Sequence, residues 1–190
     1  MRTFIAISLP PEIKKTLGEL QAKLKQADAD VAWVKPDNIH LTLKFLGEIK
    51  EKRLQRIMEI IDKTAASIPA FCGCIADIGY FPAEGPLRVI WAGLGQGDIQ
   101  LRSLAAKLEE GIAQTGIPKE KRPFQSHCTL GRVRSPRNKE DLLELLKNSE
   151  GFLKGKKLEF PVGTITLFKS TLTSQGSIYE VLKETSLQSS

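Results

Sequence analysis

Hydrophobic residues follow two different spacings along the chain, and each spacing predicts a different kind of element. Aliphatic side chains three or four positions apart predict amphipathic helices over residues 13–24, 54–61, 101–112 and 142–146. Runs rich in β-branched and aromatic residues predict strands over residues 3–9, 39–46, 71–81, 88–94, 127–133, 164–172 and 178–184. Helices and strands alternate at first, and then strands crowd the C-terminal end. This order predicts an α+β protein with mixed or antiparallel sheets rather than a doubly wound parallel sheet.

The length and composition predict one globular unit. With 190 residues, of which 41% are hydrophobic, the chain is large enough to bury a core. No linker separates independent domains, so we expect a single domain over residues 1–190, which includes the possibility of two small lobes that share a cleft. The opening "MRTFIAISLPPE" has only a short apolar run, which favours a strand over a signal peptide. No stretch is long enough to span a membrane, and we therefore expect a cytoplasmic protein.

The charge and the cysteines narrow the function only slightly. Lys and Arg number 28 against 22 Asp and Glu, for a formal net charge of +6. This balance favours polyanions such as RNA, but it also fits an ordinary soluble surface. Three cysteines, an odd number, indicate free thiols in a reducing compartment. Cys72 and Cys74 have the spacing of a strand and not that of a redox or zinc motif, so we expect them to pack in the core.

The two histidines of the chain lie in matching surroundings. His40 is found in "KPDNIHLTL" and His127 in "RPFQSHCTL", and both segments read basic residue, Pro, three residues, His, any residue, Thr, Leu. A lone histidine in a strand is most often a partly exposed or hydrogen-bonded residue without a catalytic role. Repetition of the whole pattern favours a duplicated functional motif.

Strand geometry predicts which side chains of each motif share a face. Because alternate residues of a strand point to opposite faces, His40, Thr42 and Lys44 are expected on one face, opposite the leucines between them. His127 and Thr129 are expected together in the same way. Two similar halves related by a pseudo-twofold axis would then bring both histidine and threonine pairs to one central cleft.

Two imidazoles with two hydroxyls suit in-line displacement at phosphorus. The ordinary pKa of histidine, near 6.5, allows one ring to accept a proton while the other donates one. Thr42 and Thr129 would donate hydrogen bonds to the phosphoryl oxygens. No Cys or carboxylate stands at a repeated offset from the histidines, which disfavours a metal site. Cys128 is expected to face away from His127, which disfavours a thiol nucleophile.

The motifs and their context resemble a known family. Two H-x-T-hydrophobic motifs about ninety residues apart mark the 2H phosphoesterase superfamily. "NIHLTLKFLGE", "FQSHCTLGRVR", the opening "RTFIAISLP" and the ending "LFKSTLTSQGSIYEVL" are together similar to RNA 2′,3′-cyclic phosphodiesterases, also called 2′-5′ RNA ligases. The resemblance spans nearly the whole chain. It implies a bilobal pseudo-twofold fold in which each lobe is an antiparallel sheet flanked by helices, with the two motifs facing a central cleft.

The resemblance also implies roles for individual residues. His40 would be the proton donor to the leaving 3′ oxygen and His127 the proton acceptor from water, giving a 2′-phosphate without a metal or cofactor. The residues alone do not decide which histidine is the proton donor and which is the proton acceptor, because the repeat is symmetric. Arg132 stands where the family has a basic residue, although strict alternation aims Arg132 away unless a bulge at Gly131 intervenes. Independently of the resemblance, the place of Lys44 on the motif face makes it a candidate for contact with the phosphate or the RNA backbone, and the alternative is a solvated lysine.

The same resemblance implies substrates and partners. RNA with 2′,3′-cyclic phosphate ends, for example tRNA fragments, would be hydrolysed by a monomer, and the reverse reaction would join RNA ends through a 2′-5′ linkage. "KPDN" falls short of a lysine-adenylation signature and "GLGQGD" lacks a phosphate-binding Gly-Lys-Ser/Thr ending, so no ATP is expected. Base-stacking candidates are Trp33, Tyr80, Phe81 and Phe124.

Two other functions fit the sequence as well. One is a phosphodiesterase of the same superfamily acting on 2′-5′ oligonucleotides or on small cyclic phosphates. The other is a module that binds RNA ends with little turnover. Turnover of these substrates, compared with binding alone, separates the three.

Overall fold

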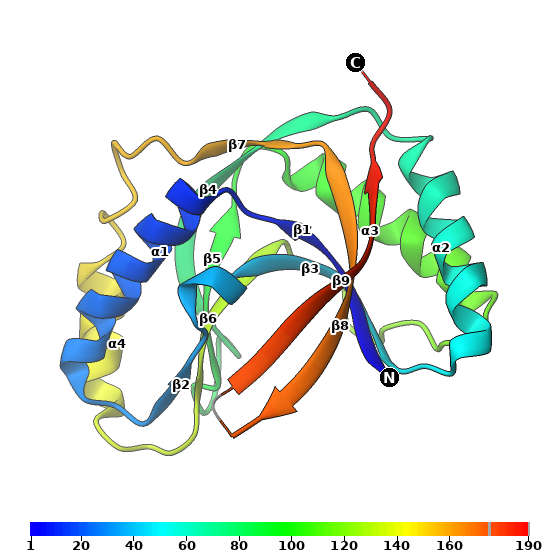
Figure 1. Ribbon diagram of the computed structural model, residues 1–190. Coiled ribbons are helices and arrows are strands. Elements are labelled where there is room, and N and C mark those ends of the chain that lie inside the picture. The colour runs from blue at the N-terminus through cyan, green and yellow to red at the C-terminus, as the bar shows by residue number, and fades with distance from the viewer. Residues whose placement is uncertain (175, 190) are drawn as a thin grey trace.

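The structure, a computed structural model, describes residues 1–174 and 176–189 and has the α+β architecture that the hydrophobic pattern predicts (Figure 1). Its strands are β1 (Arg2–Ser8), β2 (Val31–Trp33), β3 (His40–Glu48), β4 (Phe71–Phe81), β5 (Val89–Leu94), β6 (His127–Val133), β7 (Glu159–Val162), β8 (Thr164–Thr173) and β9 (Gly176–Ser186). Its α-helices are α1 (Pro11–Leu24), α2 (Glu51–Ala65), α3 (Asp98–Ala113) and α4 (Lys139–Asn148), and two 3-10 turns, η1 (Lys25–Ala27) and η2 (Pro36–Asn38), precede β2 and β3.

All four predicted helices and all seven predicted strands are confirmed. Each helix buries one stripe of aliphatic residues, as α1 does with Ile13, Leu17 and Leu20. The sequence pattern missed β2 and β7. β2 has only three residues, and β7 contains Pro161, a residue that disfavours a strand because it lacks a backbone donor. In the described part of the chain, no helix has the length and apolar character to cross a membrane.

One curled antiparallel sheet joins the two halves of the molecule. Its strand order is β7-β4-β5-β6-β3-β1-β8-β9, and β2 pairs with β6. α1 and α4 contact each other on one side, whereas α2 and α3 pack together against the strands of the other side (Figure 1). The order β1, α1, β3, α2, β4 is repeated as β5, α3, β6, α4, β8, and the repeats are related by a pseudo-twofold axis that passes between β3 and β6.

Each of the two central strands contains a bulge directly after its motif threonine. Along β1 and β3, Ile5 pairs with Lys44 and Ala6 with Thr42, so Leu43 is the extra residue. Along β5 and β6, the pairs formed by Ile90 with Gly131 and Trp91 with Thr129 make Leu130 the extra residue. Because an extra residue interrupts the alternation of a strand, side chains beyond the bulge change faces.

The first bulge corrects the prediction for Lys44. Lys44 lies on the core side of β3, with 2% of its surface exposed, and its Nζ donates to both carboxylate oxygens of Glu109 at 2.8 and 2.9 Å. It also donates to the carbonyl oxygen of Pro118 at 3.2 Å. Phe45 takes the motif face instead and is 50% exposed. Lys44 therefore fixes β3 to α3 and does not share a face with His40.

We predict that Glu109→Ala destabilises the protein strongly. The side chain of Lys44 has no exposed surface, and its charge would lose its partner, which typically costs about 3–5 kcal/mol in the free energy of unfolding. Glu110→Ala is the matched control, since the neighbouring Glu110–Lys119 pair is largely exposed and should contribute less than about 1 kcal/mol. Urea denaturation measures both, and equal losses for the two variants would contradict the prediction.

Candidate functional site

The pairing between β3 and β6 brings the two motifs together. Leu41 of β3 pairs with Cys128 of β6, and both residues are fully buried on the core side. In an antiparallel register, the residues before and after this pair lie beside each other across the strands. His40 therefore lies alongside Thr129 and Thr42 alongside His127, on the sheet face opposite the buried pair. All four are partly exposed.

Burial and nearby positive charges both act on the two imidazoles. Burial is the largest cause, and it lowers the pKa of both histidines because it disfavours the charged ring. The positive charge of Lys14, and then that of His127, lowers the pKa of His40 further. Both rings are therefore biased toward the neutral form at pH 7.

The backbone orients both rings in the same way. Nδ1 of His40 lies 2.7 Å from the carbonyl oxygen of Asn38, and Nδ1 of His127 lies 2.8 Å from that of Gln125. Since a carbonyl oxygen only accepts hydrogen bonds, Nδ1–H is the donor in each case. Nε2 of each neutral ring then carries the lone pair and is the atom available for proton transfer.

Arg132 lies on the His127 side of the sheet. Because Leu130 is the extra residue of the bulge, Arg132 lies on the same face as His127. The sequence analysis considered a bulge one position later, at Gly131. Its positive charge lowers the pKa of His127 further, after burial, which agrees with this placement. The site therefore has a fixed cation next to the second motif, whereas the equivalent position after the first motif holds Phe45.

Aromatic rings surround His40, and the sequence analysis did not place them beside this histidine. Phe4 stacks on the His40 imidazole with ring centroids 4.8 Å apart, and Tyr179 meets it edge-on at 5.4 Å. Phe168 stacks in turn on Phe4, with ring centroids 5.1 Å apart. The pairing of β1 with β3 and β8, and of β8 with β9, brings these rings together, and no local sequence pattern around His40 contains them.

The candidate stacking residues have other neighbours. Phe81 meets the imidazole of His127 edge-on at 5.1 Å, so it supports the ring. Trp33, Tyr80 and Phe124 are partly buried and pack against the hydrophobic core. Cys128 is buried as expected, and burial raises the pKa of its thiol, which disfavours a thiolate nucleophile.

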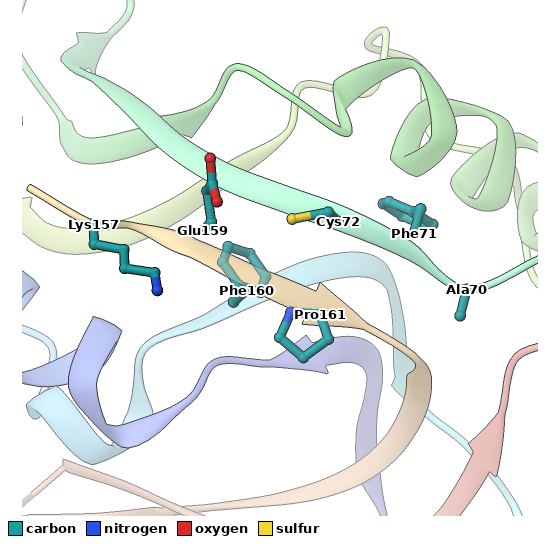
Figure 2. Close-up of a pocket in the computed structure, with 7 residues that line it drawn as sticks. All are labelled: Ala70, Phe71, Cys72, Lys157, Glu159, Phe160 and Pro161. Atoms are coloured by element: carbon teal, nitrogen blue, oxygen red, sulfur yellow. The ribbon is translucent and has the colours of Figure 1, made fainter.

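A hollow of about 530 Å³ lies outside the four motif residues. It is formed by β4 and β7 and includes Cys72, Glu159 and Phe160 (Figure 2). Cys72 is exposed there, so the prediction that it packs in the core is wrong. This hollow contains neither histidine. We therefore place the candidate site where the two motifs meet and not at this hollow.

Within residues 1–174 and 176–189, no three His, Cys, Asp or Glu side chains gather as a metal site.

Curated relatives cover nearly the full chain. The RNA 2′,3′-cyclic phosphodiesterase of Thermotoga maritima is 35% identical over 97% of this chain and 94% of its own length. The protein of the same name from Methanothermobacter thermautotrophicus is 33% identical over 94% of this chain and 95% of its own length.

Solved structures share the fold. TT0787 of Thermus thermophilus superposes with a TM-score of 0.79 at 30% identity, covering 100% of this chain and 99% of the other. Escherichia coli LigT complexed with 3′-AMP superposes with a TM-score of 0.78 at 29% identity, covering 98% and 97% of the two chains.

The two halves of the chain each match one family profile. The LigT like Phosphoesterase family matches twice, over residues 7–91 and 94–179. Each match places its histidine 33 positions after its own start (40 minus 7, and 127 minus 94), as a duplication requires. The resemblance inferred from the motifs is confirmed, and the chain belongs to the LigT-like phosphoesterase family.

Proposed function

We propose that the protein hydrolyses RNA 2′,3′-cyclic phosphodiester ends to 2′-phosphomonoesters. One observation carries the proposal: two imidazoles with the same Nδ1 anchoring, each with a threonine neighbour, converge where β3 pairs with β6. The curated relatives named RNA 2′,3′-cyclic phosphodiesterases support the substrate class.

In the proposed mechanism, Nε2 of His127 accepts a proton from water, which attacks the phosphorus. His40 enters the reaction as the imidazolium, in which Nε2 also carries a proton, and it donates that proton to the departing 3′ oxygen, so that the bond from phosphorus to this oxygen breaks. His127 then releases its proton to solvent and His40 takes one up, which restores the starting forms. Burial favours the neutral form of both rings, and the charges of Lys14 at His40 and of Arg132 at His127 add to this effect. The family resemblance, and not these charges, assigns His127 as the base and His40 as the acid.

Thr42, Thr129 and Arg132 would stabilise the phosphoryl oxygens. Two hydroxyl donors and one guanidinium surround the anion that gains charge in the transition state, and fixed donors of this kind lower the barrier without reorganising. The residues provide the acid, the base and the charge stabilisation, so the proposed reaction needs no metal.

A single chain contributes both motifs, which supports action as a monomer on RNA ends such as those of tRNA fragments. Run in reverse with an RNA 5′-hydroxyl in place of water, the site would form a 2′-5′ linkage. No ATP enters, because the energy of the cyclic phosphate is retained in the new bond.

The reaction class is tested with an RNA oligonucleotide that ends in a 2′,3′-cyclic phosphate, in excess chelator. We expect complete conversion to a 2′-phosphate, because protein groups alone supply the chemistry. Chromatography against 2′- and 3′-phosphate standards identifies the product. Inactivation by the chelator, or a 3′-phosphate product, would contradict the proposal.

Each histidine is tested separately by substitution. His40→Ala and His127→Ala should each lower kcat by about 10² to 10⁴, because acid and base contribute rate factors of this size. Cys72→Ala, at an exposed position away from the histidines, is the control and should keep full activity. Circular dichroism verifies folding, and a folded histidine variant with undiminished turnover would refute the assigned role.

The pH dependence follows from the burial of the rings. Both histidines should titrate below 6.5, and two resolved imidazole signals in the proton NMR spectrum report them directly. Because the folded state binds these protons more weakly than the unfolded state, their contribution lowers the free energy of unfolding as the pH falls from 6.5 through both pKa values. A pKa above 6.5 for either ring would show that this reasoning is wrong.

A further inference from the structure

The neighbour of β6 changes directly after the second motif. Cys128 of β6 pairs with Leu41 of β3, whereas Gly131 pairs with Trp33 of β2. β6 therefore exchanges one neighbouring strand for the other over the two residues between these pairs, and the second of them is Leu130, the extra residue of the bulge. Buried backbone groups at such a junction need partners that a regular ladder does not supply.

Gln21 of α1 supplies hydrogen-bond donors at this junction. Its Nε2 donates to the carbonyl oxygen of Leu130 at 2.8 Å and to that of Val34 at 2.7 Å. The N–H of Val34, the residue after β2, donates to the same oxygen of Leu130 at 2.9 Å. The amide of Gln21 thus ties the bulge of β6 to the end of β2.

Burial makes a glutamine costly at this position. Gln21 has 0% of its surface exposed, and its Oε1 has no hydrogen-bond partner among the residues that the structure describes. A buried acceptor without a partner destabilises a protein, whereas an apolar side chain of the same length would fill the space without this loss. The two backbone carbonyls that Gln21 holds are therefore what distinguishes it from an ordinary core residue.

The first motif is held by different groups at the equivalent place. The motifs are 87 positions apart, so Lys44 of β3 corresponds to Gly131 of β6 (131 minus 87). Lys44 reaches Glu109 of α3, whereas a Cβ at Gly131 would lie 2.6 Å from Cγ1 of Val31 and leaves no room for a side chain. Each half of the chain thus supports the motif strand of the other half with a helix, α3 through an ion pair and α1 through the neutral amide of Gln21.

The backbone that Gln21 holds determines where Arg132 points. Arg132 lies two positions after Leu130, and the bulge places it on the face of His127. Arg132 is exposed, so the course of its backbone, rather than packing around its side chain, directs the guanidinium toward the site. A change in the backbone at Leu130 would therefore move this charge.

We propose that Gln21 is a positioning residue, which keeps Arg132 beside His127 by fixing the bulge at Leu130. The use of Arg132 for binding the phosphoryl group rests on the proposed function. Without the amide of Gln21, the carbonyl oxygens at the junction lose a donor, and β6 is free to return to regular alternation. Regular alternation turns Arg132 to the opposite face of the sheet. Gln21 touches no reacting atom and acts through β6.

The position of Arg132 is read from the pKa of His127, which the guanidinium lowers. Gln21→Met keeps the length of the side chain and removes both donors. We expect the pKa of His127, followed by proton NMR, to rise toward its value in Arg132→Met, with a smaller change in the pKa of His40. The double variant should match Arg132→Met alone, because both substitutions remove the same interaction.

Ile13→Val is the matched control. Ile13 is also fully buried on α1, about two turns before Gln21, so this substitution weakens the packing of the helix and leaves the two donors in place. It should lower the free energy of unfolding and keep the wild-type pKa of His127. Gln21→Asn, whose amide is one methylene shorter, replaces Gln21→Met in the same comparison if the latter does not fold.

A wild-type pKa of His127 in a folded Gln21 variant would overturn the proposal. A pKa in the double variant above that of Arg132→Met would do the same, because the two residues would then act independently.

Turnover of an RNA that ends in a 2′,3′-cyclic phosphate measures the consequence for catalysis. The value of kcat/KM should fall by about tenfold or more in Arg132→Met, by a similar factor in Gln21→Met, and no further in the double variant, since one hydrogen bond to a charged group contributes about this much. The NMR titration needs no substrate. An inactive wild-type protein would therefore refute the proposed function, while the pKa of His127 would still decide the role of Gln21.

Discussion

The site depends on a single contact between strands from the two halves of the chain. Leu41 and Cys128, both buried, pair at the only register position where β3 and β6 meet in the described chain. Their burial drives this pairing through the hydrophobic effect, and the alternation of both strands then obliges the motif side chains to share the opposite face. An apolar contact thus positions two polar groups that are 87 residues apart (127 minus 40).

The bulges after the two threonines modify this simple alternation. Both insert a leucine into the core, and both exchange the faces of the residues that follow. In the second motif the exchange brings a cation, Arg132, beside a histidine. In the first motif the exchange turns Lys44 into the core, where it forms an ion pair with Glu109, and it leaves Phe45 exposed. The same kind of bulge therefore gives the two motifs different electrostatic surroundings.

Periodicity was enough to predict the helices, most of the strands and the grouping of His40 with Thr42 and His127 with Thr129. It failed for Lys44, because a bulge depends on how the neighbouring strand is paired and leaves no mark in the hydrophobic pattern. It also missed Phe4 and Trp91, whose positions beside the motifs follow from cross-strand register. Long-range pairing, and not local sequence, decides which side chains surround each imidazole.

The central claim is that both imidazoles contact one phosphate, and the most direct measurement is a titration of the protein with adenosine 2′-monophosphate followed by ¹⁵N NMR of the histidine rings. The account predicts that the Nε2 signals of His40 and His127 both shift, with the same dissociation constant, while both Nδ1 signals remain typical of a hydrogen-bonded N–H. A response from one ring alone would contradict it, because a single phosphate would then not lie between them.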